Sequence, residues 1–298
     1  MVVGLALGVG VDMLRVGGLD PWLAARGPGV SASVPPYDAQ GRLVDVGDVE
    51  VYLDCRGSGS PTVILEAGFG SGAAGWGETI DGVAAFTRVC AWDRPGLGRS
   101  EAAPIHSAGE TADLLFRTLH LANEDGPFVV VAHSFGGVYG RLFAERIEAE
   151  GRNGNVRSFL MLDTYEPDLG MDVDPSLPEE VRAGIRRVLD ETAAMLAGGE
   201  ALDWDRTMAE LVAAGPVEQP AILLTVDPRS RWVDPDPAMA ERLVEAWHRN
   251  MRSRYPNGTF EVAERSGHMI QWDRPDLVIA RTRDLVERVR AAPDDPGA

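Results

Sequence analysis

Short apolar runs alternate with longer amphipathic segments along most of this chain, and this alternation constrains the fold more than any other feature. Runs rich in Val, Ile, Leu and Phe predict strands at 42–46, 49–55, 62–66, 88–92, 127–133, 157–163, 219–225 and 258–263. Apolar residues at helical spacing predict helices near 76–86, 107–122, 135–148, 236–254 and 274–291. Together these patterns predict an α/β fold, with a mostly parallel eight-stranded sheet and helices on both faces.

The alternation is interrupted once, between residues 164 and 218. This segment has helical patterns near 179–197 and 204–214 and no strand pattern. An insertion after the sixth strand is expected above the carboxyl ends of the sheet, where open α/β folds bind ligands. We therefore divide the chain into an N-terminal apolar segment and linker, a first part of the core, a small helical lid and a second part of the core, at 1–41, 42–163, 164–218 and 219–298.

Charge and the N-terminus bear on partners and location. The chain has 46 acidic and 28 basic residues and a formal net charge of -18. This field repels phosphate backbones and anionic lipid surfaces, so we expect no nucleic-acid partner. Residues 2–10 are apolar but too few to span a bilayer, and they resemble the apolar core of a signal peptide without its usual basic start. We expect no stable membrane span and a cytoplasmic location, with export or anchoring through residues 1–25 as the alternative.

The two cysteines lie in predicted strands that are sheet neighbours in such a fold. Cys55 ends one strand and Cys90 lies inside another. Two buried free thiols are the more common outcome, because paired strands rarely present both sulfurs in bonding geometry. A disulfide is the alternative.

The strongest functional signal is the stretch Val-Val-Val-Ala-His-Ser-Phe-Gly-Gly-Val at 129–138, where a strand passes through Ser134 directly into a helix. Such a sharp turn requires small flanking residues, and Ala132 and Gly136 meet this need. The turn would raise the serine hydroxyl clear of the sheet, beside the N–H groups of the helix N-terminus. We predict that Ser134 is a nucleophile; the alternative is a serine that only caps the helix.

An acyl-transfer site also needs a second N–H donor and a base. The glycine-rich turn at 67–70 follows the third predicted strand, so we predict the backbone N–H groups of Phe69 and Phe135 as an oxyanion hole. Among the five histidines, His268 follows the last strand and precedes the C-terminal helix, on the same edge of the sheet as Ser134. We predict His268 as the general base and expect the His133 side chain on the other side of the turn.

These motifs, in this order, resemble the α/β-hydrolase superfamily over about residues 41–290. The stretch Asp-Arg-Pro-Gly-Leu-Gly-Arg-Ser at 93–100 and the Ser-Gly-His at 266–268 are part of the likeness. The resemblance implies that 93–100 shapes a loop without a catalytic role and that 164–218 covers the acyl pocket. It also argues against an epoxide hydrolase or haloalkane dehalogenase, because their chemistry needs a carboxylate at the position of Ser134.

The acid that pairs with His268 has two main candidates. The family usually places it three residues after a Gly that closes the seventh strand, but Arg229 stands at that position and Asp227 comes early. Some relatives carry the acid at the end of the sixth strand, where Asp163 lies. We favour Asp163 over Asp227, with Asp234 third.

The resulting hypothesis is a serine hydrolase that cleaves a small carboxylic ester through an acyl-enzyme. No histidine or cysteine shows metal-ligand spacing, so we expect neither a metal nor an organic cofactor. Cleavage of an amide, lactone, thioester or carbon–carbon bond is an alternative on the same fold, and a catalytically silent ligand-binding scaffold is another. The motifs specify no oligomeric state.

Overall fold

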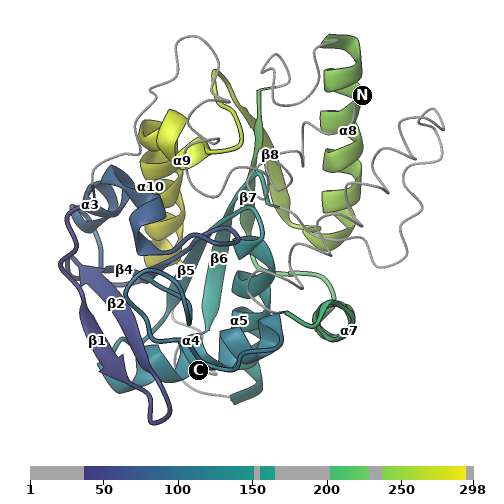
Figure 1. Cartoon of the computed structure of the whole chain (residues 1–298). Coiled ribbons are helices and arrows are strands. Elements are labelled where there is room, and N and C mark those ends of the chain that lie inside the picture. Colours follow the sequence, from purple (N-terminus) through teal and green to yellow (C-terminus); the bar gives the residue numbers. More distant parts are fainter. Residues whose placement is uncertain (1–36, 151–154, 165–201, 228–236, 293–298) are drawn as a thin grey trace, which may run out of the picture.

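The eight predicted strands form one sheet in the computed structural model, which describes residues 37–150, 155–164, 202–227 and 237–292 (Figure 1). The strands are β1 (Arg42–Asp45), β2 (Glu50–Arg56), β3 (Thr62–Glu66), β4 (Val89–Trp92), β5 (Phe128–His133), β6 (Val156–Leu162), β7 (Ala221–Val226) and β8 (Gly258–Ala263). Their order is β1-β2-β4-β3-β5-β6-β7-β8. The pairs β1–β2 and β2–β4 are antiparallel and all other neighbours are parallel, which confirms the predicted fold.

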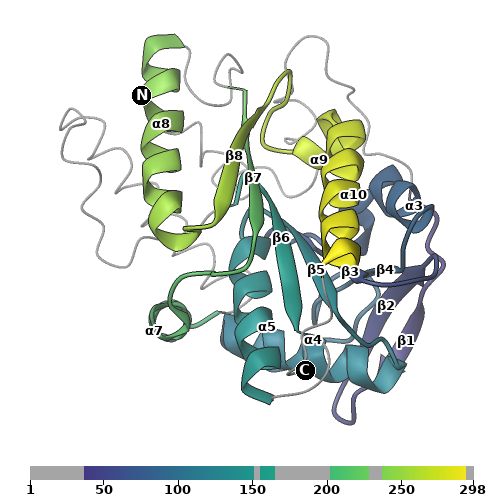
Figure 2. The ribbon, with the colours of Figure 1, turned by 180° about the vertical axis from the view of Figure 1, so that it is seen from behind.

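Helices cover both faces of this sheet (Figures 1 and 2). They are η1 (Ala73–Trp76), α3 (Glu78–Ala84), α4 (Ala108–Ala122), α5 (Gly136–Glu150), α7 (Trp204–Ala214), α8 (Pro237–Arg254), α9 (Ile270–Asp273) and α10 (Pro275–Ala291). One buried cluster joins the sheet to α4 and α5, and a second joins it to α3 and α10. The short helices η1 and α9 were not predicted, because one turn is too short to show a periodic pattern.

Strand β5 explains why its sequence is a continuous apolar run. Phe128, Val130 and Ala132 pack in the cluster with α4 and α5, whereas Val129 and Val131 pack in the cluster with α3 and α10. Side chains alternate between the faces of a strand, so a strand covered on both faces needs apolar residues at every position.

The chain stays hydrogen-bonded to its neighbour just beyond the carboxyl ends of β5 and β6. The N–H of Ser134 donates to the carbonyl of Leu162 at 3.0 Å, and the N–H of Asp163 donates to the carbonyl of Leu224 at 2.7 Å. Ser134 and Asp163, both predicted for the site, therefore follow the carboxyl ends of two adjacent strands.

The cysteines are bonded, so the expectation of two free thiols is wrong. Cys55 of β2 lies directly opposite Cys90 of β4 in the antiparallel register, with a Cα–Cα distance of 4.0 Å. The sequence placed both residues in neighbouring strands, but only the register put them opposite one another.

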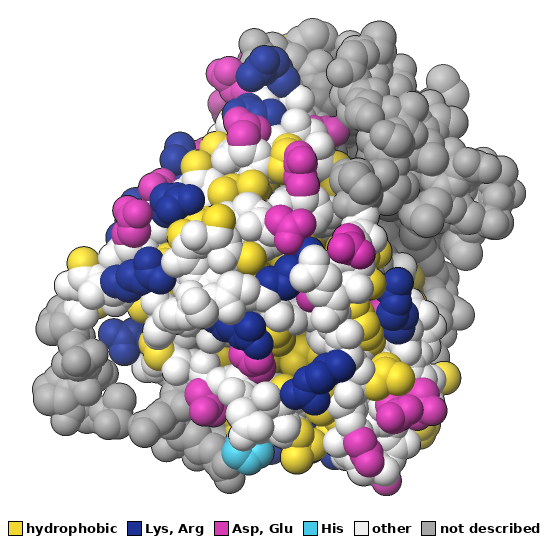
Figure 3. Space-filling model, turned by 90° about the vertical axis from the view of Figure 1, so that its left-hand side faces the viewer, with side chains coloured by type: hydrophobic (Ala, Val, Ile, Leu, Met, Phe, Trp, Pro, Cys, Tyr) yellow, Lys and Arg dark blue, Asp and Glu magenta, His cyan; other side chains and the backbone are white. Residues whose placement is uncertain are grey.

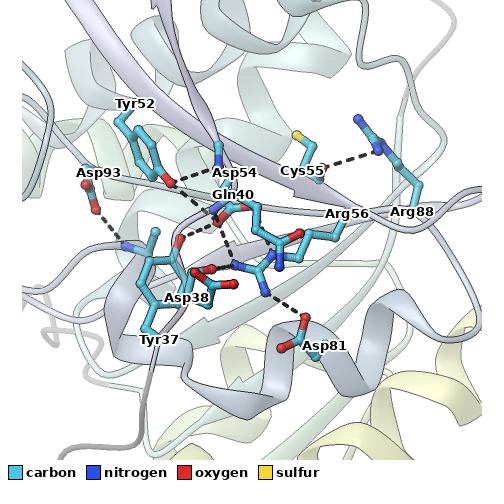
Figure 4. A network of polar contacts seen from close by, with 12 residues as sticks. Tyr37, Asp38, Gln40, Tyr52, Asp54, Cys55, Arg56, Asp81, Arg88 and Asp93 are labelled. Atoms are coloured by element: carbon cyan, nitrogen blue, oxygen red, sulfur yellow. Dashed lines mark hydrogen bonds and ion pairs between the residues drawn. The ribbon is translucent and has the colours of Figure 1, made fainter.

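A buried polar network docks residues 37–41 onto β2 (Figure 4). The Tyr37 hydroxyl donates to Asp54 at 2.6 Å, and the Arg56 guanidinium binds both oxygens of Asp54 at 3.0 and 2.8 Å. Arg56 also contacts Asp81 of α3 at 2.6 Å. Burial and the adjacent Asp54 carboxylate raise the pKa of Tyr37 above its ordinary range. Hydrogen bonds from this network to the fully buried Asp54 carboxylate therefore fix the segment that precedes β1.

Much of the predicted N-terminal segment and lid, residues 1–36 and 165–201, lies outside the described residues. The described end of the lid segment contains α7, which docks on the start of α4. Glu210 accepts hydrogen bonds from the Ser107 hydroxyl at 2.8 Å and from the Gly109 N–H at 2.9 Å. The described end of the segment predicted as a lid is thus attached to the core by a cap on α4.

Arginine and acidic side chains are interspersed on the face that carries β1, α3 and α10 (Figure 3). Although the chain has a net charge of -18, the acidic side chains of this face do not form a single patch. Across the described ranges, no helix is both long enough and apolar enough to cross a bilayer.

Candidate active site

Ser134 lies on the sharp turn between β5 and α5. Its φ is +52°, in the left-handed region that residues with a side chain rarely adopt. A Cβ on Gly136 would lie 2.3 Å from the carbonyl oxygen of Glu66 and 2.8 Å from that of Ala67, so this position accepts only glycine. Ser134 is half-buried while its neighbours Ala132 and Phe135 are buried. The turn thus presents the serine at the sheet edge, as the sequence pattern predicted.

His268 and Asp163 form a direct pair. Nδ1 of His268 lies 2.7 Å from Oδ2 of Asp163, and the two side chains are 14% and 18% exposed. A carboxylate only accepts, so the shared proton belongs on Nδ1 and leaves Nε2 as the basic ring nitrogen. The His268 loop is attached to α9, because the N–H of Gly267 donates to Asp273 at 2.8 Å.

His133 connects the His268 loop to the turn that carries Ser134. Its Nε2 lies 2.9 Å from the backbone oxygen of His268, and the two imidazole centroids are 4.6 Å apart. The carbonyl oxygen accepts, so Nε2 of His133 carries a hydrogen and donates. Burial lowers the pKa of His133 well below its ordinary value, and the neighbouring His268 lowers it further. We expected this side chain on the other side of the turn from Ser134; it lies against the His268 loop, a contact that sequence position alone does not reveal.

The turn after β3 lies against Ser134. A Cβ on Gly68 would be 3.2 Å from the Ser134 Cβ and 3.0 Å from Nδ1 of His133. The rings of Phe69 and Phe135 meet edge to face, with centroids 6.3 Å apart. The structure therefore brings together the two residues whose N–H groups were predicted to bind an oxyanion.

Asp227, the other candidate acid, occupies a different position. It is 4% exposed at the end of β7, where its Oδ2 accepts a hydrogen bond from the N–H of Arg265 at 2.8 Å. Its own N–H donates to the carbonyl of Ser266 at 3.2 Å. These bonds shape the turn that precedes His268, whereas Asp163 contacts the imidazole itself. The third candidate, Asp234, lies outside the described residues.

The family profile described as "Alpha/beta hydrolase family" matches residues 63–281, which is most of the chain. The chain belongs to the alpha/beta hydrolase family.

Individual relatives resemble this hydrolase over different spans. An uncharacterized protein of Schizosaccharomyces pombe is 52% identical over 61 residues, which are 20% of this chain and 11% of that protein. The ligand-free structure of the epoxide hydrolase CorEH has a TM-score of 0.57 at 17% identity, covering 85% of this chain and 100% of that one. A thermophilic esterase from Thermogutta terrifontis has a TM-score of 0.56 at 17% identity, covering 84% and 99%. The hydrolase thus shares its fold with enzymes of more than one chemistry.

Asp93 and Ser100 of the hydrolase hold backbone groups, in agreement with the loop-shaping role that the resemblance implied. The Asp93 carboxylate accepts from the N–H of Ala73 at 2.8 Å and from the N–H of Arg99 at 2.9 Å. The Ser100 hydroxyl donates to the Asp93 carbonyl and accepts from the N–H of Tyr52 at 2.8 Å. These bonds join β2, η1 and the loop after β4.

In the part of the hydrolase that the structure describes, one group of side chains has the spacing of metal ligands. It consists of Cys55, Cys90 and Glu124. Both sulfurs are in the disulfide, so neither is a thiolate that could bind a metal. This group therefore offers a single carboxylate and makes no metal site.

Proposed function

We propose that this hydrolase cleaves carboxylic esters by an acyl-enzyme mechanism, with Ser134 as nucleophile, His268 as general base and Asp163 as the acid that orients it. The contact of 2.7 Å between His268 Nδ1 and Asp163 Oδ2 carries the proposal. A serine hydroxyl is a weak nucleophile until a base accepts its proton, and a base held in one tautomer by a carboxylate meets this need.

Each residue has a defined part in the reaction. Nε2 of His268 accepts the proton as the Ser134 oxygen attacks the ester carbonyl, and Asp163 stabilises the imidazolium that forms. The N–H groups of Phe69 and Phe135 bind the negative oxygen of the tetrahedral intermediate. His268 then gives its proton to the departing alcohol, and a water activated by the same imidazole releases the acid and frees Ser134.

Hydrolysis of p-nitrophenyl esters from acetate to palmitate, measured beside Ser134→Ala, tests the proposal. We expect the substitution to lower kcat by on the order of 10⁴-fold or more, because it removes the nucleophile. The chain-length optimum of the wild type measures the acyl pocket. Retention of more than about a few per cent of the activity by Ser134→Ala would contradict the assignment.

Ser107→Ala provides a matched control, because Ser107 is a helix cap. Its side chain accepts a hydrogen bond from the N–H of Glu110 at 3.2 Å at the start of α4. This substitution should cost about 1 kcal/mol of stability and leave kcat unchanged. If Ser134 were only a cap, the two variants would behave alike.

A fluorophosphonate separates the enzyme from a silent binding scaffold. An activated serine is phosphonylated, so the wild type and Ser107→Ala should be labelled and Ser134→Ala should not. A folded wild type that stays unlabelled and hydrolyses no ester would favour the scaffold.

A further inference from the structure

A buried ion pair lies behind the turn that follows β3. Arg94 is 2% exposed and Glu66 is fully buried, with Arg94 Nη1 2.9 Å from Glu66 Oε1. Trp92 Nε1 donates to the other carboxylate oxygen at 2.7 Å, and the Arg94 guanidinium lies 4.5 Å from the centroid of the Tyr139 ring. Burying two charges is costly, so a pair held this closely needs further partners to offset its lost hydration.

Those further partners are carbonyl groups of the turn itself. Arg94 Nη1 donates to the carbonyl of Ala67 at 2.8 Å, and Nη2 donates to the carbonyl of Gly68 at 2.7 Å. The N–H of Ser71 donates to the same Gly68 oxygen at 3.1 Å. The Gly68 carbonyl is thus fixed by two donors, one of them a buried cation.

Fixing this carbonyl also fixes the N–H of Phe69, because both belong to one planar peptide unit. The cis peptide bonds of the described residues are Ser60–Pro61 and Gly126–Pro127, so the Gly68–Phe69 bond is trans. In a trans unit the C=O and N–H point in opposite directions. With its carbonyl directed at Arg94, the unit directs the Phe69 N–H away from Arg94. A cation on the carbonyl also polarises the unit and makes its N–H a stronger donor.

We propose that Arg94 is a positioning residue for the oxyanion hole: it orients and polarises the Gly68–Phe69 peptide so that the Phe69 N–H can bind the developing oxyanion. The inference rests on the proposed function and extends it to the loop at 93–100, which the resemblance treats as a shape-giving segment. Glu66 neutralises the cation through Nη1, and both Nη groups still donate to carbonyls of the turn. Arginine suits this role because its planar fork donates in several fixed directions at once.

The test replaces both charges, since removing Arg94 alone would leave Glu66 buried and unpaired. In Arg94→Met/Glu66→Gln the amide oxygen still accepts from Trp92. Loss of one oxyanion donor lowers kcat by about 10²- to 10³-fold, so a misdirected one should lower it by roughly 30- to 100-fold. KM for the p-nitrophenyl ester should stay within about threefold, because the donor acts on the transition state.

Asp54→Asn/Arg56→Met is the matched control. It also removes a buried arginine–carboxylate pair, but Arg56 lies opposite Val89 at the start of β4, whereas Arg94 follows the end of that strand. We expect this control to lower the melting temperature and leave kcat of the folded protein unchanged. The affinity for an alkyl boronic acid, which forms a tetrahedral adduct with an activated serine, should fall with kcat in the Arg94 variant and not in the control.

Two further measurements distinguish a positioning role from a general loss of active-site structure. The acid limb of the kcat/KM pH profile reports the pKa of the general base, and it should not move in Arg94→Met/Glu66→Gln. Arg94→Lys keeps a charge beside Glu66 and therefore the fold, but its single ammonium cannot reproduce the fork to both carbonyls, so we expect roughly a tenfold loss of kcat.

The outcomes are distinct. A double variant with the kcat and boronate affinity of the control would overturn the role of Arg94 and leave ester hydrolysis standing. So would a loss that appears only in KM or as a shifted pH limb. A wild type that neither hydrolyses esters nor reacts with a fluorophosphonate would overturn the proposed function, and the role of Arg94 with it.

Discussion

Oδ2 of Asp163 lies 2.7 Å from Nδ1 of His268, although 105 residues separate them in the chain. Asp163 follows the last residue of β6 with a φ of +42°, an unusual conformation for a residue with a side chain. His268 reaches it from the loop after β8, two strands away in the sheet. A close pair built from two distant loops, one of them strained, is typical of functional sites.

Asp163→Asn should abolish most of the activity if Asp163 orients His268. An amide cannot stabilise the imidazolium and favours the wrong tautomer, and the comparable change in a serine protease lowers kcat by about 10⁴-fold. Asp227→Asn is the matched comparison: it keeps an oxygen for the N–H of Arg265, so we expect kcat to fall by less than about tenfold. Steady-state kinetics on one ester measures both. A reversed order of the two effects would make Asp227 the acid.

The left-handed backbone of Ser134 should cost stability. Ser134→Gly and Ser134→Ala both remove the hydroxyl, but only glycine adopts a φ of +52° without steric strain. We expect Ser134→Gly to be more stable than Ser134→Ala by about 1 kcal/mol in urea denaturation. Equal midpoints for the two variants would mean that the turn stores no strain at this position.

Buried His133 should make the protein less stable in acid. Burial, and then electrostatic repulsion from the neighbouring His268, lower the pKa of His133 in the folded state below the ordinary 6.5. Below pH 6.5 the unfolded chain therefore binds a proton that the folded chain does not. The free energy of unfolding should fall by up to about 1.4 kcal/mol per pH unit from this group as the pH decreases below 6.5.

Urea denaturation of wild type and His133→Gln between pH 7 and pH 5 measures this contribution. The glutamine amide can donate where Nε2 of His133 donates, but it does not titrate, so the variant should lose less stability in acid. His120→Gln is the control, since His120 is exposed on α4 and solvated in both states. Parallel pH curves for wild type and His133→Gln would show that His133 does not contribute.

The Cys55–Cys90 disulfide should stabilise the fold. It closes a loop with a sequence separation of 35, for which the lost entropy of the unfolded chain is worth about 3–4 kcal/mol. Dithiothreitol should therefore lower the Tm of the wild type but not that of Cys55→Ala/Cys90→Ala. An unchanged Tm of the wild type would show that the thiols are free.

Local sequence patterns determined which elements form and where the sharp turn at Ser134 lies. Each predicted strand begins and ends within two residues of its observed bounds. For the central strands such as β3 and β5 the reason is that burial on both faces requires an unbroken apolar run. The turn at Ser134 was readable because it needs small residues at fixed offsets from the serine. His268 was readable from its place between the last strand and the last helix, and the family profile confirms the fold that these patterns predicted.

Only the tertiary structure distinguished positions that look alike along the chain. Asp163 and Asp227 both end parallel strands, so the strand pattern predicts the same sheet edge for both; the backbone at 163 and the turn at 264–266 decide which carboxylate contacts His268. The register of β2 against β4 likewise decided that Cys55 and Cys90 are bonded. The contacts of His133 and Arg94 depend on loops that approach from other strands. Periodicity and spacing specify which face or edge a residue occupies, whereas a hydrogen-bond partner is set by angstrom-scale placement of segments far apart in sequence.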